Sequence, residues 1–271
     1  MCTTCGCGAD EVRVTQVGPP DAAAPPAKHT HSAGHEHAHP AEHAHPHTHP
    51  GQHDHTHTIE LEQRVLAKND QLAERNRRWF TAHGITAVNL MSSPGAGKTS
   101  LLERTIKEHD RAVTVIEGDQ ETVFDAERIR AAGARAVQVN TGAGCHLDAT
   151  MVQRALAELA PDDGGVVFIE NVGNLVCPAL FDLGEDKKVV IISVTEGDDK
   201  PLKYPHMFAA ADLVLVNKTD LLPYVDFDME RCERDARRVN PGLAWIPLSV
   251  RTGENLAAWH GWLGGLRRAT V

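Results

Sequence analysis

The chain has 271 residues, of which 41% are hydrophobic and 24% are charged, and its formal net charge is −10. This composition is close to the average for globular proteins, which excludes a wholly disordered chain, and the length is enough for one large or two small domains. The acidic balance argues against a nucleic-acid partner. No apolar run approaches the roughly 18 residues of a membrane-spanning helix, so we also exclude an integral membrane protein.

The chain opens on a cysteine cluster, residues 1–8, that contains Cys2, Cys5 and Cys7. It has neither the basic residues nor the apolar stretch of a secretory signal, so we expect a cytoplasmic protein whose thiols stay reduced. Three thiolates this close together, with the amine of Cys2 as a fourth ligand if Met1 is removed, suit Ni²⁺. The alternative is a flexible tail whose thiols bind nothing.

Residues 9–58 are rich in alanine, proline and histidine, and 12 of the 17 histidines lie between His29 and His57. No Val, Ile, Leu or Met occurs in residues 28–58. Such a segment cannot bury enough apolar surface to offset its loss of entropy, so we expect a disordered metal-binding tail. Its many imidazoles impose no geometry and indicate a metal reservoir rather than a selective site.

Ordered structure is expected from about Thr58, with residues 59–271 as one folded domain. Leu61, Val65, Leu72 and Trp79 recur at helical spacing and predict a first helix. Short apolar runs then alternate with helical patterns, which predicts an α/β fold: a mainly parallel sheet flanked by helices. The predicted strands are 86–91, 112–117, 134–139, 166–170, 189–195, 213–217 and 243–247, and a helix is predicted at 147–159.

A glycine-rich turn, Ser92 to Thr99, follows the first of these strands and leads into a helical pattern. Its amides can converge on phosphate oxygens, while Lys98 reaches the β- and γ-phosphates and Thr99 binds Mg²⁺. Strand, loop and helix together predict a P-loop NTPase, although serine stands where the general pattern has its first glycine. The residues expected to contact nucleotide here are Ser93, Pro94, Gly95, Ala96, Gly97, Lys98, Thr99 and Ser100.

A second motif, Asn217-Lys218-Thr219-Asp220, follows a later buried strand. A carboxylate such as Asp220 can accept hydrogen bonds from both N1–H and the exocyclic amine of guanine, a donor pair that adenine lacks. Asn217 can bridge base and loop, and the Lys218 stem can cover the ring. The guanine oxygen can then meet a backbone amide of the loop that holds Ser249, Val250 and Arg251. An ordinary strand-end turn is the alternative.

Two acidic residues, Asp119 and Glu170, follow apolar strands and are the candidates for holding Mg²⁺, directly or through water. Either could instead be a helix cap or a surface acid. With Lys98 and Thr99 they form the predicted catalytic set.

A second metal site is predicted at Cys145, His146 and Cys177, which lie in loops after the third and fourth strands. Thiolate and imidazole suit both Ni²⁺ and Zn²⁺, and a symmetric pair of chains would bring two such sets together. The alternative is that these cysteines only pack against the sheet; Cys232, on a later helix, is expected to be structural.

These motifs, together with Glu170-Asn171-Val172-Gly173 and Cys145-His146-Leu147-Asp148, resemble those of the HypB family of nickel-incorporation GTPases. The resemblance covers about residues 59–271, which it makes a GTPase domain, and extends to the cysteine cluster. It implies slow GTP hydrolysis, a GTP-promoted homodimer, and nickel delivery to the large subunit of [NiFe]-hydrogenase with a HypA-type chaperone. It also assigns a tight nickel site to Cys2, Cys5 and Cys7, and a nickel or zinc site to Cys145, His146 and Cys177.

Three alternatives stay open. A urease accessory GTPase is the nearest, but that family carries Cys-Pro-His, and no proline separates Cys145 from His146. The second alternative is a nickel storage protein with a vestigial nucleotide site. The intact Lys98, Thr99 and Asp220 argue against it. An ATP-driven metal-cluster chaperone is disfavoured by the guanine motif. We hypothesise a switch in which GTP and Mg²⁺ order the loops of Asp119 and Glu170 and so change nickel affinity.

Overall fold

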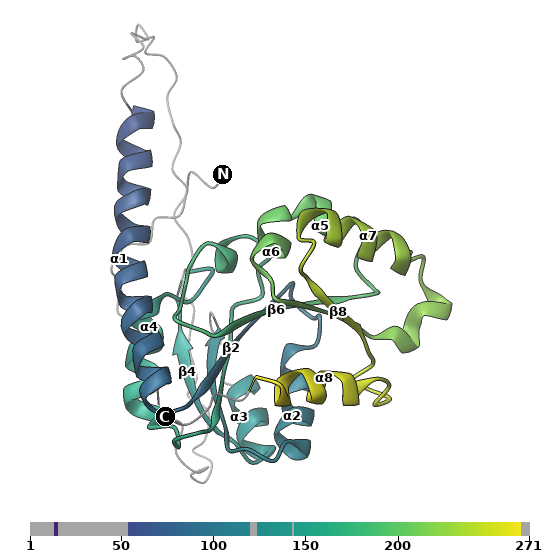
Figure 1. Ribbon diagram of the computed structural model, residues 1–271, viewed down its shortest axis with the longest axis horizontal. Helices are drawn as coiled ribbons and strands as arrows, with labels where there is room; N and C mark the ends of the chain where they lie inside the picture. Colours follow the sequence, from purple (N-terminus) through teal and green to yellow (C-terminus); the bar gives the residue numbers. More distant parts are fainter. Residues whose placement is uncertain (1–13, 16–53, 120–123, 143, 267–271) are drawn as a thin grey trace, which may run out of the picture. The chain divides into compact units, whose positions relative to one another are not determined.

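The computed structural model of the protein describes residues 14–15, 54–119, 124–142 and 144–266, with the backbone alone at 14–15, 54–63 and 124 (Figure 1). Cys2, Cys5, Cys7 and most of the histidine-rich tail therefore lie outside the described residues. The sheet and the part of helix α1 from Val65 onward belong to one compact unit, and the earlier turns of α1 belong to another. None of the described helices is long and apolar enough to span a membrane.

The predicted parallel sheet is present. Its strands are ordered β1-β4-β3-β5-β2-β6-β7-β8, and all neighbours are parallel except the two-residue β1, which pairs antiparallel with β4. The strands are β1 (Val14–Thr15), β2 (Thr86–Ser92), β3 (Val113–Asp119), β4 (Arg135–Asn140), β5 (Val166–Glu170), β6 (Lys187–Ser193), β7 (Leu213–Asn217) and β8 (Ala244–Pro247).

Helices follow most of the strands and cover both faces of the sheet. The α-helices are α1 (Asp54–Ala82), α2 (Lys98–Glu108), α3 (Phe124–Ala131), α4 (Ala149–Leu159), α5 (Lys200–Lys203), α6 (Pro205–Ala210), α7 (Met229–Val239) and α8 (Leu256–Gly264). Two short 3₁₀ helices, η1 (Cys177–Ala179) and η2 (Thr219–Tyr224), lie in loops.

The structure differs from the sequence-based expectation at a few boundaries. Strand β1 and the start of α1 at Asp54 both fall within the segment 9–58 that we expected to be disordered. The physical reason for β1 is that the edge strand β4 has unpaired backbone groups that a passing segment can bond. Strand β6 begins at Lys187 and ends at Ser193, earlier than predicted. Helix α4 begins at Ala149 because the Asp148 side chain caps it, accepting from the Met151 N–H at 2.8 Å.

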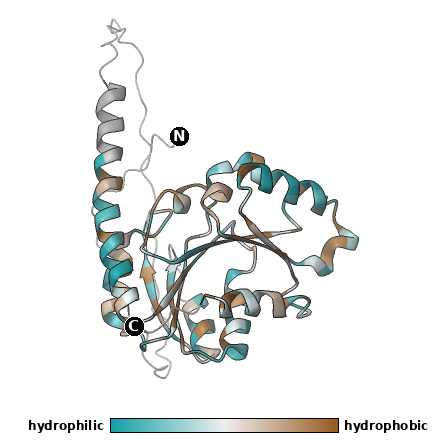
Figure 2. Cartoon of the chain, in the orientation of Figure 1, coloured by the Kyte–Doolittle hydropathy of each residue, from teal (hydrophilic) through white to brown (hydrophobic). Residues whose placement is uncertain are grey.

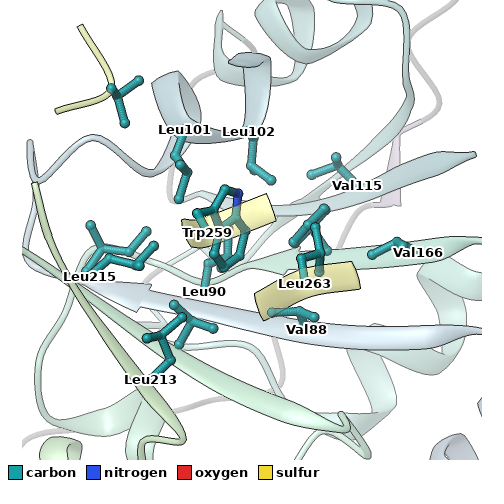
Figure 3. Close-up of a cluster of buried hydrophobic side chains, with 14 of the residues drawn as sticks. Val88, Leu90, Leu101, Leu102, Val115, Val166, Leu213, Leu215, Trp259 and Leu263 are labelled. Carbon is teal, nitrogen blue, oxygen red and sulfur yellow. The ribbon is translucent and has the colours of Figure 1, made fainter. Parts of the chain in front are cut away.

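Two helical layers sandwich the sheet. Helices α2, α3 and α8 pack on one face, where Trp259 is fully buried among Leu90, Leu101 and Leu263 (Figure 3). The Trp259 indole N–H donates to Thr105 Oγ1 at 2.9 Å, so its polar atom is satisfied inside the core. On the other face, apolar residues of α4, α6 and α7 pack against alternate strand positions. Helix α7 is mostly hydrophilic outside its narrow buried face (Figure 2).

The first helix is confirmed, but its buried face differs from the apolar positions that indicated it. Val65 is 50% exposed, whereas Asn69, Asn76 and Phe80 are buried. Asn76 Nδ2 donates to the carbonyls of Ala149 (2.9 Å) and Leu183 (3.0 Å), so burial of this amide is compensated by hydrogen bonds. Asn69 bonds the neighbouring groups, the Asp182 carbonyl and the Ala149 N–H, so the two asparagines tie α1 to the start of α4 and to the segment before β6.

Candidate nucleotide and metal sites

The phosphate loop leaves β2 at Ser92 and ends at the amino terminus of α2, where Lys98 is the first helical residue. Gly97 has φ of +104°, a conformation that favours glycine, and a Cβ at this position would collide with the Asn217 side chain. Lys98 Nζ donates to Ser92 Oγ at 2.7 Å. The serine at the first loop position therefore supplies an acceptor that glycine would lack.

Below the loop lie two buried carboxylates. Thr99 Oγ1 donates to Glu170 Oε1 at 2.8 Å, while Glu170 Oε2 and Glu117 Oε2 are buried without a hydrogen-bond partner. Burial, reinforced by the charges of Glu170 and Asp119, raises the pKa of Glu117 to about 9. Burial also raises the pKa of Glu170 to about 7, against the opposing effect of Lys98. Burial therefore favours the protonated form of both acids, and a bound cation would shift them back to the ionised form.

A cavity of about 440 Å³ contains these groups and fits a phosphate chain with its cation. A hydroxyl and one or two carboxylates beside phosphate oxygens are a donor set typical of Mg²⁺ in proteins, and such an ion could satisfy the partnerless oxygens of Glu117 and Glu170. The charged and hydroxyl side chains that line the cavity are Lys98, Thr99, Ser100, Glu117, Asp119, Asp125, Arg128 and Glu170.

A neighbouring cavity of about 460 Å³ is bounded by the Asn217–Asp220 motif, by α2 and by the loop at Val250 and Arg251. Asn217 Nδ2 donates to the Ala96 carbonyl at 2.9 Å, and Asn217 Oδ1 accepts from the Val250 N–H at 3.1 Å. One side chain thus joins the phosphate loop to the predicted guanine loop. Lys218 Nζ also reaches the phosphate loop, donating to the Gly95 carbonyl at 2.8 Å.

Asp220 points into this second cavity, and its carboxylate is oriented by its neighbours. Ser249 Oγ donates to Asp220 Oδ1 at 2.6 Å, and Arg251 Nη1 lies 3.6 Å from Oδ2. A carboxylate that is fixed in this way can present its free lone pairs to a pair of N–H donors on a bound base. This position is compatible with the predicted contact between Asp220 and a guanine base.

The three predicted metal ligands of the folded domain come together. The ligand atoms of Cys145, His146 and Cys177 all lie within 4.8 Å of one another, although Cys177 is 32 positions beyond Cys145. Burial lowers the pKa of His146, which favours the neutral imidazole that a metal requires. The ring stacks on Phe181 with centroids 3.9 Å apart, so its orientation is restricted. Two thiols and an imidazole suit Ni²⁺ or Zn²⁺.

Asn171 connects the metal loop to the nucleotide cavity. It follows Glu170 directly, and its Oδ1 accepts from the backbone N–H of Leu147, the residue after His146, at 3.1 Å. In a second hydrogen bond, Asn174 Nδ2 donates to the Cys145 carbonyl at 3.4 Å. The segment that carries Glu170 thus holds the loop that carries two metal ligands.

Comparison with known proteins agrees with this geometry. The model of the family described as CobW/HypB/UreG, nucleotide-binding domain, matches residues 86–247. A hydrogenase maturation factor HypB of Azotobacter vinelandii is 51% identical over 97% of this chain and 91% of its own length. One from Escherichia coli K12 is 49% identical, with 97% and 98% covered. This chain belongs to the HypB family.

Solved structures of the HypB family have the same fold. HypB of Archaeoglobus fulgidus matches with a TM-score of 0.70 and 41% identity, over 75% of this chain and all of that chain. HypB of Helicobacter pylori, solved in complex with nickel, matches with a TM-score of 0.70 and 36% identity, over 75% of this chain and 99% of that chain.

In this HypB-family chain, three residues that line the phosphate cavity were not predicted from the sequence: Glu117, Asp125 and Arg128. A signal for Glu117 existed, because residues two apart on a strand share a face, and Glu117 stands two before Asp119. Asp125 and Arg128 lie on α3, three residues apart and therefore on one helix face. Nothing in their local pattern tells which face meets the phosphate loop.

Proposed function

We propose that this chain is a GTP-hydrolysing nickel chaperone for hydrogenase maturation, in which nucleotide state sets nickel affinity. The observation that carries the proposal is the hydrogen bond between Asn171 and the Leu147 N–H, because it joins the loop beside Glu170 to the loop of the metal ligands. Family membership supports it, since the relatives are named hydrogenase maturation factors. The nickel complex of the Helicobacter pylori relative supports the choice of metal.

For hydrolysis, the proposal assigns phosphate binding to the backbone amides of the loop and to Lys98. Thr99, Asp119 and Glu170 would hold Mg²⁺, which when bound supplies positive charge beside the phosphates. Glu170 already accepts from Thr99 at 2.8 Å, so these two side chains are positioned before any ion arrives. No general base is required, because positioning and charge stabilisation provide most of the catalysis in phosphoryl transfer.

Specificity for GTP is assigned to Asn217, Lys218 and Asp220, with Ser249, Val250 and Arg251 forming the facing loop. Adenine would not supply the two N–H donors that guanine offers to the partly buried carboxylate of Asp220, which costs binding free energy. Asn217 donates to the phosphate loop and accepts from the Val250 N–H, which supports a site that binds base and phosphates together.

The cargo would be nickel bound by Cys145, His146 and Cys177, with zinc as a competitor. A four-coordinate ion held by these three side chains would need one more ligand. A homodimer promoted by GTP would bring the same three ligands of a second chain close to it. Cys2, Cys5 and Cys7 would form a separate tight nickel site, and the histidine tract a reservoir. A HypA-type chaperone and the [NiFe]-hydrogenase large subunit are the proposed partners.

The decisive experiment measures nickel affinity at the folded-domain site with GDP and with a non-hydrolysable GTP analogue. The full-length chain with Cys2, Cys5 and Cys7 changed to serine serves for this, because thiolate-to-nickel charge-transfer absorption then reports only on the remaining thiols. We expect affinities that differ by about fivefold or more, within the range of allosteric couplings. Equal affinities with the two nucleotides would contradict the switch.

A GTP turnover assay separates this proposal from nickel storage with a vestigial nucleotide site. Slow release of phosphate from GTP, and not from ATP, is expected. A chain that binds nickel but hydrolyses neither nucleotide would instead support storage.

A further inference from the structure

Helix α3 brings a guanidinium to the phosphate cavity. Arg128 lines that cavity together with Lys98, Thr99 and Glu170. Its Nη2 donates to Ser100 Oγ at 3.3 Å, in the first turn of α2, whose amino terminus forms the end of the phosphate loop. The positive charge of Arg128 acts to lower the pKa of Glu170. Arg128 is therefore part of this site, although it lies 30 positions beyond Lys98.

The guanidinium is held by two partly exposed carboxylates that can release it. Nη2 lies 2.8 Å from Glu103, and Nη1 lies 3.1 Å from Asp125. The Arg128 side chain is 44% exposed, and ion pairs as exposed as these contribute little to stability. Exchanging one of these carboxylates for a phosphate oxygen thus costs little free energy. The other carboxylate continues to orient the planar guanidinium of Arg128.

The charge distribution of the cavity favours this exchange. Glu117, Asp119, Asp125 and Glu170 line it, and among the described residues only Lys98 and Arg128 add basic side chains. Residues 120–123, which connect Asp119 to α3, are Gln, Glu, Thr and Val and contribute no lysine or arginine. A triphosphate that enters this acidic cavity, even with its Mg²⁺ and Lys98, would be stabilised further by a second basic side chain.

In hydrolysis, water forms a bond to the γ-phosphorus while the bond to the β–γ bridging oxygen breaks. That oxygen keeps the electron pair as part of GDP, and the protons of the water leave with phosphate and solvent. Negative charge on the phosphate oxygens is redistributed in the transition state, where a guanidinium within the same chain can stabilise it.

We propose that Arg128 is a catalytic residue of this chain, which binds the phosphates of GTP in cis and stabilises the transition state of hydrolysis. This inference rests on the proposed GTPase activity. It adds a residue that the phosphate loop, the guanine motif and the metal ligands do not include.

The test uses the full-length chain, its Arg128→Ala and Arg128→Lys variants, and Arg135→Ala as a matched control. Arg135 is also an ion-paired, exposed arginine, 2.7 Å from Asp162, but it begins β4 at the opposite end of the strands from the site. Arg128→Ala is expected to lower kcat for GTP by about 1,000-fold or more, the scale of an arginine that stabilises the transition state of phosphoryl transfer. Arg128→Lys keeps the positive charge but lacks the planar guanidinium, so it should recover only part of the lost kcat.

A second readout separates catalysis from a structural role. GDP with aluminium fluoride mimics the transition state, so Arg128→Ala should lose this complex while GDP affinity and melting temperature change little. If Arg128 only joined α3 to α2, GDP binding and melting temperature would fall and the aluminium fluoride complex would weaken no more than GDP binding does.

Mixing experiments test the cis assignment. A chain with Lys98→Ala retains Arg128 but has a disabled phosphate loop, so adding it to Arg128→Ala should not restore turnover. Restoration would show that the arginine acts from a partner chain and would overturn the inference. Equal kcat for Arg128→Ala and the unaltered chain would also overturn it, whereas no turnover by the unaltered chain would contradict the proposed GTPase itself.

Discussion

Asn89 and Asn171 are hydrogen-bonded to each other inside the sheet, Nδ2 of Asn171 lying 3.3 Å from Oδ1 of Asn89. Asn89 in turn donates to buried Glu185 at 3.0 Å, and the second Glu185 oxygen accepts from the Leu183 N–H at 2.7 Å. Buried networks that are satisfied in this way are rigid. Asn171, which also holds the Leu147 N–H, is therefore fixed in the position from which it joins the two sites.

Replacing Asn171 with alanine should uncouple nickel affinity from nucleotide. The Leu147 N–H loses its acceptor, so a movement of the segment that carries Glu170 is no longer transmitted to the loop of Cys145 and His146. In the chain lacking the first three cysteines, the ratio of nickel affinities with GTP analogue and GDP should fall toward one. Asn240→Ala, which removes an asparagine bonded to carbonyls near α6, is the matched control and should preserve the ratio. An unchanged ratio in Asn171→Ala would argue against this route of coupling.

Lys98→Ala should abolish hydrolysis without removing nickel from the amino-terminal cysteines. The charge that faces the β- and γ-phosphates is lost, and turnover is expected to fall by about 100-fold or more. Nickel stoichiometry at Cys2, Cys5 and Cys7, followed by metal-edge spectroscopy, should stay the same. Retained turnover would mean that the phosphate loop has been misinterpreted.

Asp220→Asn should weaken GTP binding and admit a different base. An amide cannot accept from both guanine donors, so affinity for GTP should drop by roughly 10- to 100-fold. Xanthosine triphosphate, which has a carbonyl where guanine has its amine, should bind better to the variant. Isothermal calorimetry measures both, with Asp162→Asn as the control at an exposed site away from the base.

The nucleotide-free, metal-free chain should lose stability as pH rises. Because the pKa values of Glu117 and Glu170 are raised to about 9 and about 7, the folded state binds more protons than the unfolded one. The free energy of unfolding therefore falls from the ordinary carboxyl range up to about pH 9. Glu117→Gln should flatten this fall in urea titrations between pH 6 and 9, whereas the exposed Glu158→Gln should leave it in place.

Thiol reagents should distinguish Cys232 from the metal ligands. Burial raises the pKa of Cys232 to about 12, so almost no thiolate exists at pH 8. Cys145 and Cys177 are partly exposed and should react with iodoacetamide, measured residue by residue by mass spectrometry. Nickel should protect these two, and unfolding in urea should expose Cys232. Rapid labelling of Cys232 in the folded chain would contradict its burial.

The sequence by itself determined the features that depend on local chemistry. A parallel α/β fold follows from buried strands that alternate with helices, and the P-loop follows from a strand, a glycine turn and Lys98-Thr99. The motif ending in Asp220 needs only its own residue types and the strand before it. Each of these is decided by neighbouring residues, because backbone freedom, hydrogen-bonding capacity and hydrophobic period are properties of short segments.

Only the tertiary structure decided which distant segments meet. That Cys177 joins Cys145 and His146, that Asn171 bonds the Leu147 N–H, and that Arg128 lies against Ser100 all depend on strand order and on how helices rotate against the sheet. The buried face of α1 was decided in the same way, since burial of Asn76 is compensated by the carbonyls of Ala149 and Leu183, which accept from its amide. Contacts between separate segments are set by packing of the whole core, which no local pattern contains.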